Sequence, residues 1–366
     1  MDALIVAGGR GTRLQPLTDT VLKPLLEFCG EPFLLGVMRR LAQAGVDRVL
    51  LVVGERTEPF DVLREPAREL GLAFETVPEP EPLDTAGGIR SVAADLDGPF
   101  LVLNGDILTD VNVDAVVSRH REVGADATIV LTRVQDTSSY GVCVREGTRI
   151  VDFVEKPAPG SLPGQDTVNA GTYVLEPEVL LAHPQGRLSF ERDVFPGLVA
   201  RGGHLEGFVW DGVWADLGTP ERYREGHRLA LGGELSWPSV AAVPDRGDGV
   251  RVATSATIGE GAVVVGPSLV LDDAVVGPGA RLGPYACIGE RVRIAAGAQL
   301  PGAILHRDVR VDQDVCADQL LAGPGARVAQ GARLGRGVVL GAGELVGAGD
   351  VLQDGERRPP ARTTRV

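Results

Sequence analysis

The first part of the chain alternates short apolar runs with segments of helical periodicity. Helical patterns cover residues 32–44 and 113–123. The apolar runs are each typical of a buried strand, and they lie at residues 3–7, 49–53, 72–77, 100–103 and 127–131. Strands that alternate with helices predict βαβ units and a mostly parallel sheet, so the fold class is α/β.

The middle of the chain has shorter and more mixed signals. Residues 150–155 and 167–175 each predict a strand, and we expect them to form an inserted or flanking sheet that covers a pocket. Residues 220–231 predict a closing helix, because Thr219 is a good N-cap and Pro220 suits the first helical position. Residues 232–250 are rich in glycine and proline, which is typical of a linker.

Beyond the linker, an aliphatic residue recurs at every sixth position. The recurrence stays in phase from Val252 to Leu300, slips by one residue at Leu305 and Val311, and resumes at Val328. A six-residue repeat is the signature of a parallel β-helix, with three hexads to a turn. We therefore expect a β-helix domain of about five or six turns over residues 251–353. The basic, proline-containing tail at 354–366 is predicted to be disordered.

Composition excludes several classes of protein. The formal net charge of −14 argues against a binder of nucleic acid or of anionic membranes. The short first apolar run is no signal peptide, and we expect no membrane-spanning helix. The four cysteines are far apart and match no metal spacing, and the five histidines are scattered, so a zinc site is not expected. We interpret the cysteines as reduced, small hydrophobes of a cytoplasmic protein.

A glycine-rich loop follows the first apolar run. Gly8, Gly9 and Gly11 precede two cations, Arg13 and Lys23. The spacing matches neither a Walker loop nor a dinucleotide fingerprint. A strand, a glycine loop and two cations suggest a grip on phosphates, although a tight turn with surface cations remains an alternative. Because ligands bind at the carboxyl ends of parallel strands, Asp106, which follows the 100–103 run, is expected to face the same site.

Further motifs complete a known pattern. The chain carries GGRGTRLQPLT (8–18), LKP (22–24), NGD (104–106), YGV (140–142), VEKP (154–157), VNAGTY (168–173), FERDVFP (190–196) and WADLGTP (214–220). Over residues 1–231 the sequence resembles the sugar-1-phosphate nucleotidyltransferases, and most of all their mannose-1-phosphate guanylyltransferase branch. The resemblance implies a Rossmann-like nucleotidyltransferase domain at 1–231, followed by a left-handed parallel β-helix of hexapeptide repeats.

The resemblance also implies a reaction. A sugar-1-phosphate, mannose-1-phosphate by this likeness, attacks the α-phosphorus of a nucleoside triphosphate, GTP by the same likeness, and pyrophosphate leaves. Arg13 and Lys23 are the implied catalytic residues, and Asp106 and Asp216 would hold Mg²⁺. The implied nucleotide-binding residues are Gly8, Gly9, Gly11, Thr12, Arg13, Asp84, Thr85, Gly87 and Asn104. The implied sugar-phosphate-binding residues are Gly141, Glu155, Lys156, Asn169 and Gly171.

Several alternatives stay open at this point. The base could be that of UTP, dTTP or ATP, and the acceptor could be glucose-1-phosphate or a cyclitol phosphate. A hexad acyltransferase and a non-catalytic regulatory paralogue are disfavoured, the former because His306, expected to be a loop residue at the phase slip, is the lone histidine of the repeats. The family usually has glycine where this chain has Asp84; we expect that carboxylate to cap the helix that starts near Ala86. The β-helix is expected to mediate homo-oligomerisation.

Overall fold

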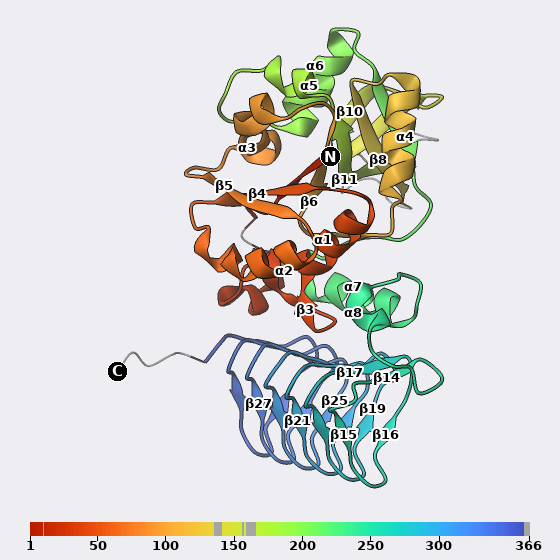
Figure 1. Cartoon of the computed structure of the whole chain (residues 1–366). Coiled ribbons are helices and arrows are strands. Elements are labelled where there is room, and N and C mark those ends of the chain that lie inside the picture. Colours follow the sequence, from red (N-terminus) through yellow and green to blue (C-terminus); the bar gives the residue numbers. More distant parts are fainter. Residues whose placement is uncertain (10, 135–140, 156, 159–165, 362–366) are drawn as a thin grey trace. The chain divides into compact units, whose positions relative to one another are not determined.

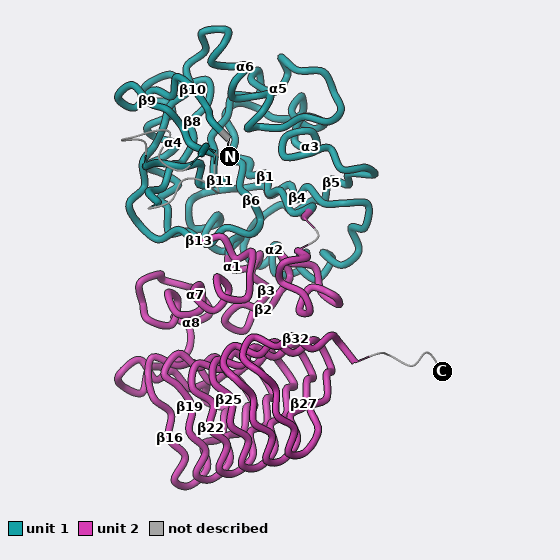
Figure 2. The backbone as a smooth tube through the Cα atoms, turned by 180° about the vertical axis from the view of Figure 1, so that it is seen from behind, with its two compact units in different colours: residues 1–8, 37–214 teal, residues 9–36, 215–366 magenta. Residues whose placement is uncertain are grey.

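The computed structural model of the chain describes residues 1–9, 11–134, 141–155, 157–158 and 166–361. Backbone contacts divide it into two compact units, coloured separately in Figure 2. Unit 1 comprises Met1–Gly8 and Val37–Trp214, and unit 2 comprises Gly9–Gly36 and Ala215–Val366. These units divide the chain at other points than the domain bounds expected from the sequence, because the segment after the first strand packs with the C-terminal part of the chain.

Unit 1 is built on a nine-stranded sheet with the order β5-β4-β1-β6-β11-β8-β12-β10-β9 (Figure 1). One half of the sheet is parallel and consists of four of the predicted strands. They are β1 (Asp2–Val6), β4 (Arg48–Gly54), β5 (Ala73–Glu79) and β6 (Phe100–Asn104). The central strands are apolar on both faces, as a sheet covered by helices on both sides requires.

The other half of the sheet corrects one expectation. Its strands are β8 (Ala127–Arg133), β9 (Gly141–Glu146), β10 (Arg149–Glu155), β11 (Thr167–Leu175) and β12 (Leu205–Val209). They continue the central sheet and do not form a separate flanking sheet. The reason lies in β11, which is buried along nearly its whole length and pairs antiparallel with both β6 and β8. The short strand β7 (Ile107–Thr109) follows β6.

The helices of this part pack their apolar faces on the sheet. Helix α4 shows why the sequence folds there: Asn112 caps its first turn by accepting a hydrogen bond from the Ala115 N–H, and Gly124 ends it in a left-handed conformation. The helices are α1 (Phe33–Gln43), α2 (Arg64–Glu69), α3 (Asp84–Val92), α4 (Val113–Val123), α5 (Pro177–Leu181) and α6 (Phe195–Ala200). None of the helices in the described part of the chain is long and apolar enough to cross a membrane.

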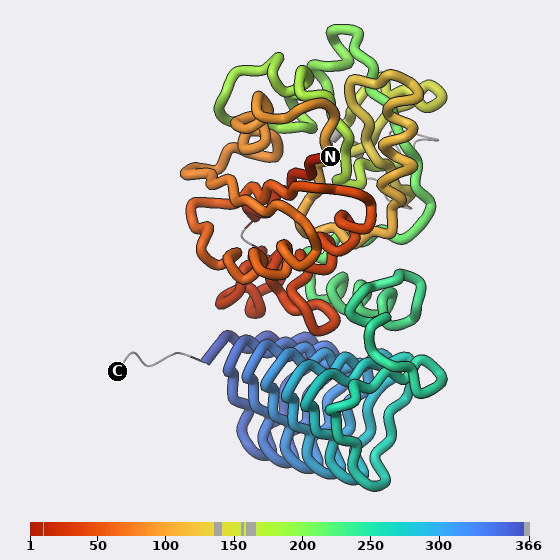
Figure 3. Tube along the Cα trace, in the orientation of Figure 1, coloured from red at the N-terminus to blue at the C-terminus, as the bar shows by residue number. Residues whose placement is uncertain are grey.

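The repeat region of unit 2 consists of three parallel sheets, the architecture of the predicted left-handed β-helix (Figure 3). The first sheet contains β14 (Val250–Val252), β17 (Ser268–Val270), β20 (Cys287–Ile288), β23 (Ile304–Leu305), β26 (Leu321–Ala322), β29 (Val339–Leu340) and β32 (Arg357–Arg358). The second contains β15 (Thr257–Ile258), β18 (Val275–Val276), β21 (Arg293–Ile294), β24 (Arg310–Val311), β27 (Arg327–Val328) and β30 (Leu345–Val346). The third contains β16 (Val263–Val264), β19 (Arg281–Leu282), β22 (Gln299–Leu300), β25 (Cys316–Ala317), β28 (Arg333–Leu334) and β31 (Val351–Leu352).

The register of the coils explains the phase slips in the sequence. Val252 pairs with Val270, one full turn of three hexads later. Ile288 pairs with Leu305, and Leu305 with Ala322, so these two turns are each one residue shorter. The aliphatic side chains of all turns line one continuous core. The repeat also runs on to β32, beyond the expected end at residue 353, so residues 354–358 are not part of a disordered tail.

Unit 2 also contains helices and strands outside the β-helix, of which the hairpin and α7 contact it. They are the hairpin β2 (Glu27–Phe28) and β3 (Glu31–Pro32), the helix α7 (Pro220–Leu231) with Thr219 as the predicted N-cap, and α8 (Pro238–Ala241). The expected linker at 232–250 is therefore more structured than its composition indicates. Trp237 is buried within it and stacks on Phe33 with ring centroids 5.6 Å apart.

Candidate active site

Unit 2 gathers the two predicted catalytic cations around one carboxylate. Arg13 lies in the 3-10 turn Thr12–Leu14, Lys23 begins the turn Lys23–Leu25, and Asp216 ends strand β13 (Trp214–Asp216). The Arg13 guanidinium is 3.9 Å from the Asp216 carboxylate, and Nζ of Lys23 is 3.8 Å from its Oδ1. The Lys23 side chain is 10% exposed, so the surrounding residues hold its ammonium group in place. The Arg13 side chain is 65% exposed, so its guanidinium can extend into solvent. This arrangement suits an anionic ligand.

Two further residues complete the cluster, and sequence reasoning missed both. Arg222, in the first turn of α7, donates a hydrogen bond to Oδ2 of Asp216 at 2.6 Å. A Cβ atom added to Gly218 would lie 2.7 Å from Oδ1 of Asp216 and 2.8 Å from the guanidinium of Arg13. Gly218 thus leaves the space in which the two side chains approach each other. Both residues stand in or beside the WADLGTP motif, which was the available signal.

Gly11 holds the glycine loop in a conformation that favours glycine. Its φ of 62° is left-handed, and an added Cβ would lie 3.1 Å from both Lys23 Cβ and Thr18 Cγ2. The Thr18 hydroxyl donates a hydrogen bond of 2.8 Å to the Gly11 carbonyl. Gly9 and Thr12 are exposed on the same loop. The predicted loop residues 9, 11, 12 and 13 therefore lie together with Lys23, as expected.

The end of the β-helix also reaches this loop. The Arg357 guanidinium, on β32, donates hydrogen bonds to the carbonyl oxygens of Arg13 at 3.1 Å and Gln15 at 3.2 Å. These two carbonyls bracket the end of the 3-10 turn that carries Arg13. Arg357 is thus a brace on the backbone of the loop.

Unit 1 brings together the predicted residues at the carboxyl ends of β1 and β6. The two strands are neighbours, with Val6 paired to Asn104. Gly8 follows β1 and Asp106 follows β6, and the Gly105 N–H donates to the Val6 carbonyl at 2.8 Å. The expectation that Gly8 and Asp106 lie at the same edge of the sheet is confirmed.

Asn104, Asn169 and Gly171 form a second group at this edge. Gly171 has a φ of 74°, and an added Cβ would lie 2.6 Å from the Asn104 amide nitrogen. The Asn169 amide donates to the Tyr173 hydroxyl at 2.9 Å and accepts from the Gly171 N–H at 2.9 Å. These bonds hold an irregularity in β11, where the pairing with β8 shifts between Asn169 and Tyr173. The motif therefore shapes the backbone beside Asn104.

A buried carboxylate that sequence reasoning missed lies next to Gly8. Glu79 ends β5 and is 7% exposed. An added Cβ would lie 3.3 Å from its Oε2 at Gly8 and 2.4 Å from its Oε1 at Gly88. Oε1 has no hydrogen-bond partner among the described residues. Burial raises the pKa of Glu79, and a hydrogen bond from the Gly88 backbone partly opposes this.

Thr85 and Gly87, in the segment 83–88, make packing contacts within unit 1. The Thr85 hydroxyl donates to Glu191 and accepts from the Phe190 N–H, both at 2.9 Å, so it docks α3 on the FERDVFP segment. Gly87 is buried, and an added Cβ would lie 2.5 Å from the Gly186 carbonyl oxygen. These contacts give Thr85 and Gly87 a role in packing. Both residues were predicted to bind the nucleotide, and that role stays a prediction.

Asp84 is not the expected N-cap. Helix α3 begins at Asp84 itself, its N-cap is Leu83, and no side chain caps it. Asp84 has a φ of 69°, which explains why glycine is usual at this position. Its carboxylate forms ion pairs with Arg192 and, at 3.4 Å, with Arg187, and it accepts from the Thr85 N–H at 3.0 Å.

Three more of the residues expected to bind the sugar phosphate belong to β9, to β10 and to the segment that follows β10. Gly141 and Glu155 face each other at the paired ends of β9 and β10, and Lys156 lies outside the described residues. His306, expected to be a loop residue, follows β23 outside any strand as expected, and it is buried with Nε2 3.2 Å from the Tyr223 hydroxyl.

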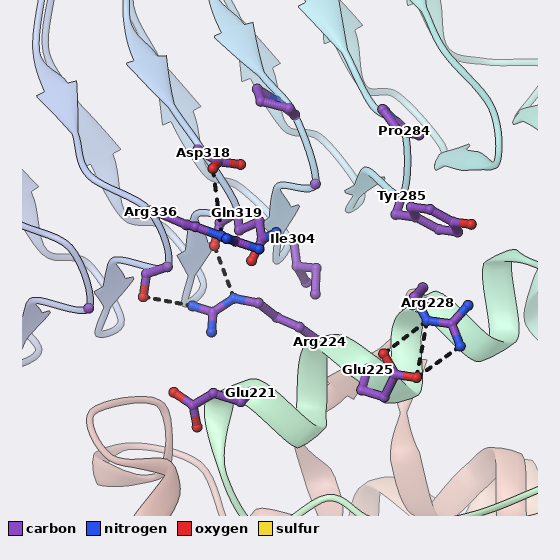
Figure 4. A pocket seen from close by; sticks show the side chains of 14 residues that line it. Glu221, Arg224, Glu225, Arg228, Pro284, Tyr285, Ile304, Asp318, Gln319 and Arg336 are labelled. Carbon is purple, nitrogen blue, oxygen red and sulfur yellow. Dashed lines mark hydrogen bonds and ion pairs between the residues drawn. The ribbon is translucent and has the colours of Figure 1, made fainter.

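A separate groove of about 700 Å³ lies between α7 and the β-helix within unit 2 (Figure 4). Its arginines are already paired. Arg224 donates to the carbonyls of Gln319 at 3.0 Å and Gly337 at 2.8 Å, Arg228 pairs with Glu225, and Arg336 lies 3.8 Å from Asp318. No predicted site residue lines this groove, and its charges are balanced, so it is not the phosphate-binding site.

Comparisons with known proteins agree with this geometry. Residues 2–232 match the family model described as nucleotidyl transferase. The chain is 39% identical over 301 residues to the mannose-1-phosphate guanylyltransferase of Mycobacterium tuberculosis, covering 81% of this chain and 82% of that protein. It is 34% identical to mannose-1-phosphate guanylyltransferase 1 of Arabidopsis thaliana, covering 85% and 82%. The crystal structure of HddC from Yersinia pseudotuberculosis complexed with GMP-PN is 28% identical, covers 62% of this chain and 97% of that one, and has a TM-score of 0.52.

A glycine loop with paired cations, placed after the first strand of an α/β sheet, thus coincides with a family match over the same residues. The chain belongs to the nucleotidyl transferase family. It is a nucleotidyltransferase enzyme that acts on a nucleotide and a sugar phosphate, in a family that generally uses a divalent metal.

Proposed function

We propose that this enzyme transfers the guanylyl group of GTP to mannose-1-phosphate, which gives GDP-mannose and pyrophosphate. The observation that carries the proposal is the name shared by the relatives, which match this chain over more than four fifths of its length. HddC, crystallised with GMP-PN, adds that a protein of this fold holds a guanine nucleotide. The cation cluster at Asp216 supplies the chemistry that the reaction needs.

The reaction joins two anions, so neutralisation of charge comes first. A phosphate oxygen of mannose-1-phosphate attacks the α-phosphorus of GTP, and the bond from that phosphorus to the bridging oxygen of the β-phosphate breaks. We assign Arg13 to the β- and γ-phosphates, because its exposed guanidinium can reach a ligand and follow the departing pyrophosphate. Lys23 is assigned to the α-phosphate, because a buried, fixed cation stabilises charge that develops there.

The loop amides complete the grip on the triphosphate. Gly8, Gly9, Gly11 and Thr12 present backbone that a phosphate can approach closely. Asn104 lies at the same sheet edge as Gly8 and is assigned to the nucleotide. Gly141, Glu155, Lys156, Asn169 and Gly171 remain the proposed contacts of the sugar phosphate.

Asp106 and Asp216 are the proposed ligands of Mg²⁺. The donor set fits in unit 2, because Oδ1 of Asp216 is buried and has no hydrogen-bond partner among the described residues. Carboxylates together with substrate phosphates are the ligands that Mg²⁺ prefers, and the ion would supply positive charge to the transferring phosphate. Arg222 holds the second oxygen of Asp216 and so fixes the direction in which Oδ1 points.

We propose that the Glu79 carboxylate recognises the guanine base. Guanine offers two adjacent donors, N1–H and the exocyclic amino group, and a carboxylate can accept from both. Oε1 of Glu79 needs such a donor, because it is buried with no partner in the described part of the chain. The glycines at 8 and 88 leave the space around it. Donors from the base would also lower the pKa that burial raises.

Two further features of the proposal are the assembly and the location. Exposed aliphatic side chains on the β-helix, among them Val263, Leu345 and Val351, support homo-oligomerisation through that region, which light scattering of the purified protein would test. The four free cysteines support a cytoplasmic location, which localisation of a tagged full chain would test.

The reaction is tested by pyrophosphate release from a matrix of substrates. GTP, UTP, dTTP, ATP and CTP are each paired with mannose-1-phosphate, glucose-1-phosphate and a cyclitol phosphate. We expect the highest kcat/KM for GTP with mannose-1-phosphate. A higher kcat/KM for another pair would replace the proposed substrates, and no release from any pair would reject the proposed reaction.

The role of Glu79 is tested by Glu79→Gln, which keeps the size of the side chain but replaces one acceptor with a donor. We expect kcat/KM for GTP to fall by about 10- to 100-fold, the scale of one misread base contact. The kcat/KM for UTP should change little. An equal loss with both nucleotides would assign Glu79 a structural role.

A further inference from the structure

Three buried side chains that can bind metals meet inside unit 2. Cys29 lies at the turn of the β2–β3 hairpin, His227 on α7 and Cys287 on β20. One donor atom of each lies within 4.8 Å of the other two. They are 0%, 1% and 3% exposed. This cluster was not predicted, because Cys29 and His227 are 198 positions apart and match no motif spacing.

The imidazole of His227 is oriented as in a metal site. Its Nδ1 is 2.9 Å from the backbone carbonyl oxygen of Tyr223, which can only accept, so Nδ1 carries the proton. Nε2 therefore keeps its lone pair, which accepts a hydrogen bond of 3.3 Å from the Cys29 backbone N–H and would exchange this bond for the metal. Metal-ligating histidines usually donate their other ring N–H to a carbonyl or carboxylate in this way.

The surroundings of the cluster would make an unpaired thiolate costly. Both sulfur atoms are buried beside the imidazole of His227. The carboxyls of Glu27 and Glu31 act on Cys29 and would repel a thiolate there. A bound cation would offset the cost of a buried thiolate in such surroundings.

We infer that Cys29, His227 and Cys287 form a site for one thiophilic metal ion, of the Zn²⁺ or Cu⁺ class. Ligand atoms around a tetrahedral zinc ion lie about 3.5–3.8 Å apart, so the three donors would move by at most about 1 Å toward one another. Thiolate sulfur and imidazole nitrogen are the donors that such ions prefer. Three protein ligands suit a trigonal Cu⁺ directly, and they suit Zn²⁺ with a water as the fourth ligand.

The site would act as a staple within unit 2. It would join the hairpin that follows Lys23, the helix that carries Arg222, and the β-helix. Since it lies outside the proposed reaction, the inference does not depend on the identity of the substrates. Two protons, one from each thiol, leave as the metal binds.

The test uses the full chain, purified under a phosphine reductant without chelator. Its zinc and copper are measured by mass spectrometry, and the metal-free protein is titrated with Co²⁺ and with Cu⁺. Cys29→Ser and Cys287→Ser are compared with the matched controls Cys143→Ser and Cys316→Ser, whose thiols are outside the cluster. We expect one equivalent of metal, and sulfur-to-cobalt absorption in the near ultraviolet, for the wild type and both controls and for neither cluster variant.

The wild type alone can overturn the inference, so a variant that misfolds does not protect it. Absence of retained metal together with absence of cobalt absorption would reject the site. Equal binding by Cys29→Ser would also reject it. Peptide mapping that finds a Cys29–Cys287 disulfide in protein isolated without reductant would replace it with a redox pair. A rise in Tm on addition of Zn²⁺ to the wild type, but not to Cys287→Ser, would support it.

Discussion

Asp84 adopts a left-handed backbone conformation that glycine would adopt at a lower free-energy cost. Its left-handed backbone costs an L-residue roughly 1 kcal/mol, and glycine avoids that cost. Its carboxylate compensates through the ion pairs with Arg187 and Arg192. Asp84 therefore lacks the conformational freedom of glycine, but its ion pairs attach α3 to the segment that precedes α6.

This balance predicts the order of two variants. Asp84→Gly loses the ion pairs but gains conformational freedom where it is needed, so its free energy of unfolding should stay within about 1 kcal/mol of the wild type. Asp84→Ala loses the same pairs and keeps the strained backbone, so it should be less stable than Asp84→Gly by about 1 kcal/mol. Urea unfolding of the three proteins measures this order, and an alanine variant as stable as the glycine variant would contradict it.

Gly218 offers a way to disturb the active site without disturbing the fold. In Gly218→Ala the new methyl group would displace the exposed end of Arg13 and the carboxylate of Asp216, which Arg222 and Lys23 hold. We expect kcat to fall by about 10- to 100-fold, the effect of misplacing a catalytic group by about 1 Å, while Tm changes little. Pyrophosphate release and thermal unfolding provide the two readings. The control is Gly197→Ala, at a glycine in α6 where an added Cβ would make only ordinary contacts of 3.5 Å or more, which should leave kcat unchanged.

At the scale of elements, the β2–β3 hairpin and the β-helix carry two buried groups of opposite effect. Burial raises the pKa of Glu27 to about 7, so the folded protein keeps a proton that the unfolded chain loses above about 4.5. Stability from Glu27 therefore falls as the pH rises from about 4.5 to 7. Burial lowers the pKa of His306 to about 3, so stability from His306 falls as the pH drops from about 6.5 towards 3.

Between about pH 4.5 and 6.5 these two contributions cancel, because the folded and unfolded states bind the same number of protons at the pair. Glu27→Gln removes one of them. Its free energy of unfolding, relative to the wild type, should rise by up to about 1.4 kcal/mol per pH unit across this window. Chemical unfolding at several pH values measures the slope. Parallel pH profiles for the two proteins would show that Glu27 titrates normally in the fold.

The elements were predicted with different success, for physical reasons. The aliphatic ladder of the β-helix was readable because every coil must present an inward side chain at the same step, and the shortened turns at Leu305 and Ala322 left their mark as phase slips. The parallel strands β1, β4 and β6 were equally readable as apolar runs. The place of β11 within the main sheet was not, because strand pairing between distant segments leaves no local pattern.

The site was predicted in the same uneven way. Arg13, Lys23 and Asp216 follow from motifs, and the structure brings them together. Glu79 and Arg222 were not predicted as site residues. In a sequence, a lone glutamate and a helix-surface arginine look like ordinary solvated residues until their neighbours are known. Thr85 and Gly87, predicted to bind the nucleotide, also make packing contacts that their motif does not indicate, and their binding role stays a prediction.

At the scale of the whole molecule, Arg357 connects the last coil of the β-helix with the loop that carries Arg13. Arg357→Ala removes both hydrogen bonds to the loop backbone, so the loop should sample more conformations. We expect kcat to fall by about 10-fold with KM for GTP raised, as measured by pyrophosphate release. Arg358→Ala, which removes the neighbouring arginine and its pair with Glu356, is the matched control and should behave as the wild type. Equal rates for the two variants would remove the brace from catalysis.

Because of this contact, the length of the β-helix determines whether Arg357 reaches the loop that carries Arg13. Each coil adds about 4.8 Å to the stack, so an extra or missing coil would carry Arg357 a full strand spacing away from the carbonyls that it holds. Solenoids elsewhere can gain and lose repeats because only their neighbours notice. Here the position of Arg357 on the loop that carries Arg13 depends on the number of coils, so insertion of one coil should break these bonds, whereas changes at the corners of the coils should not.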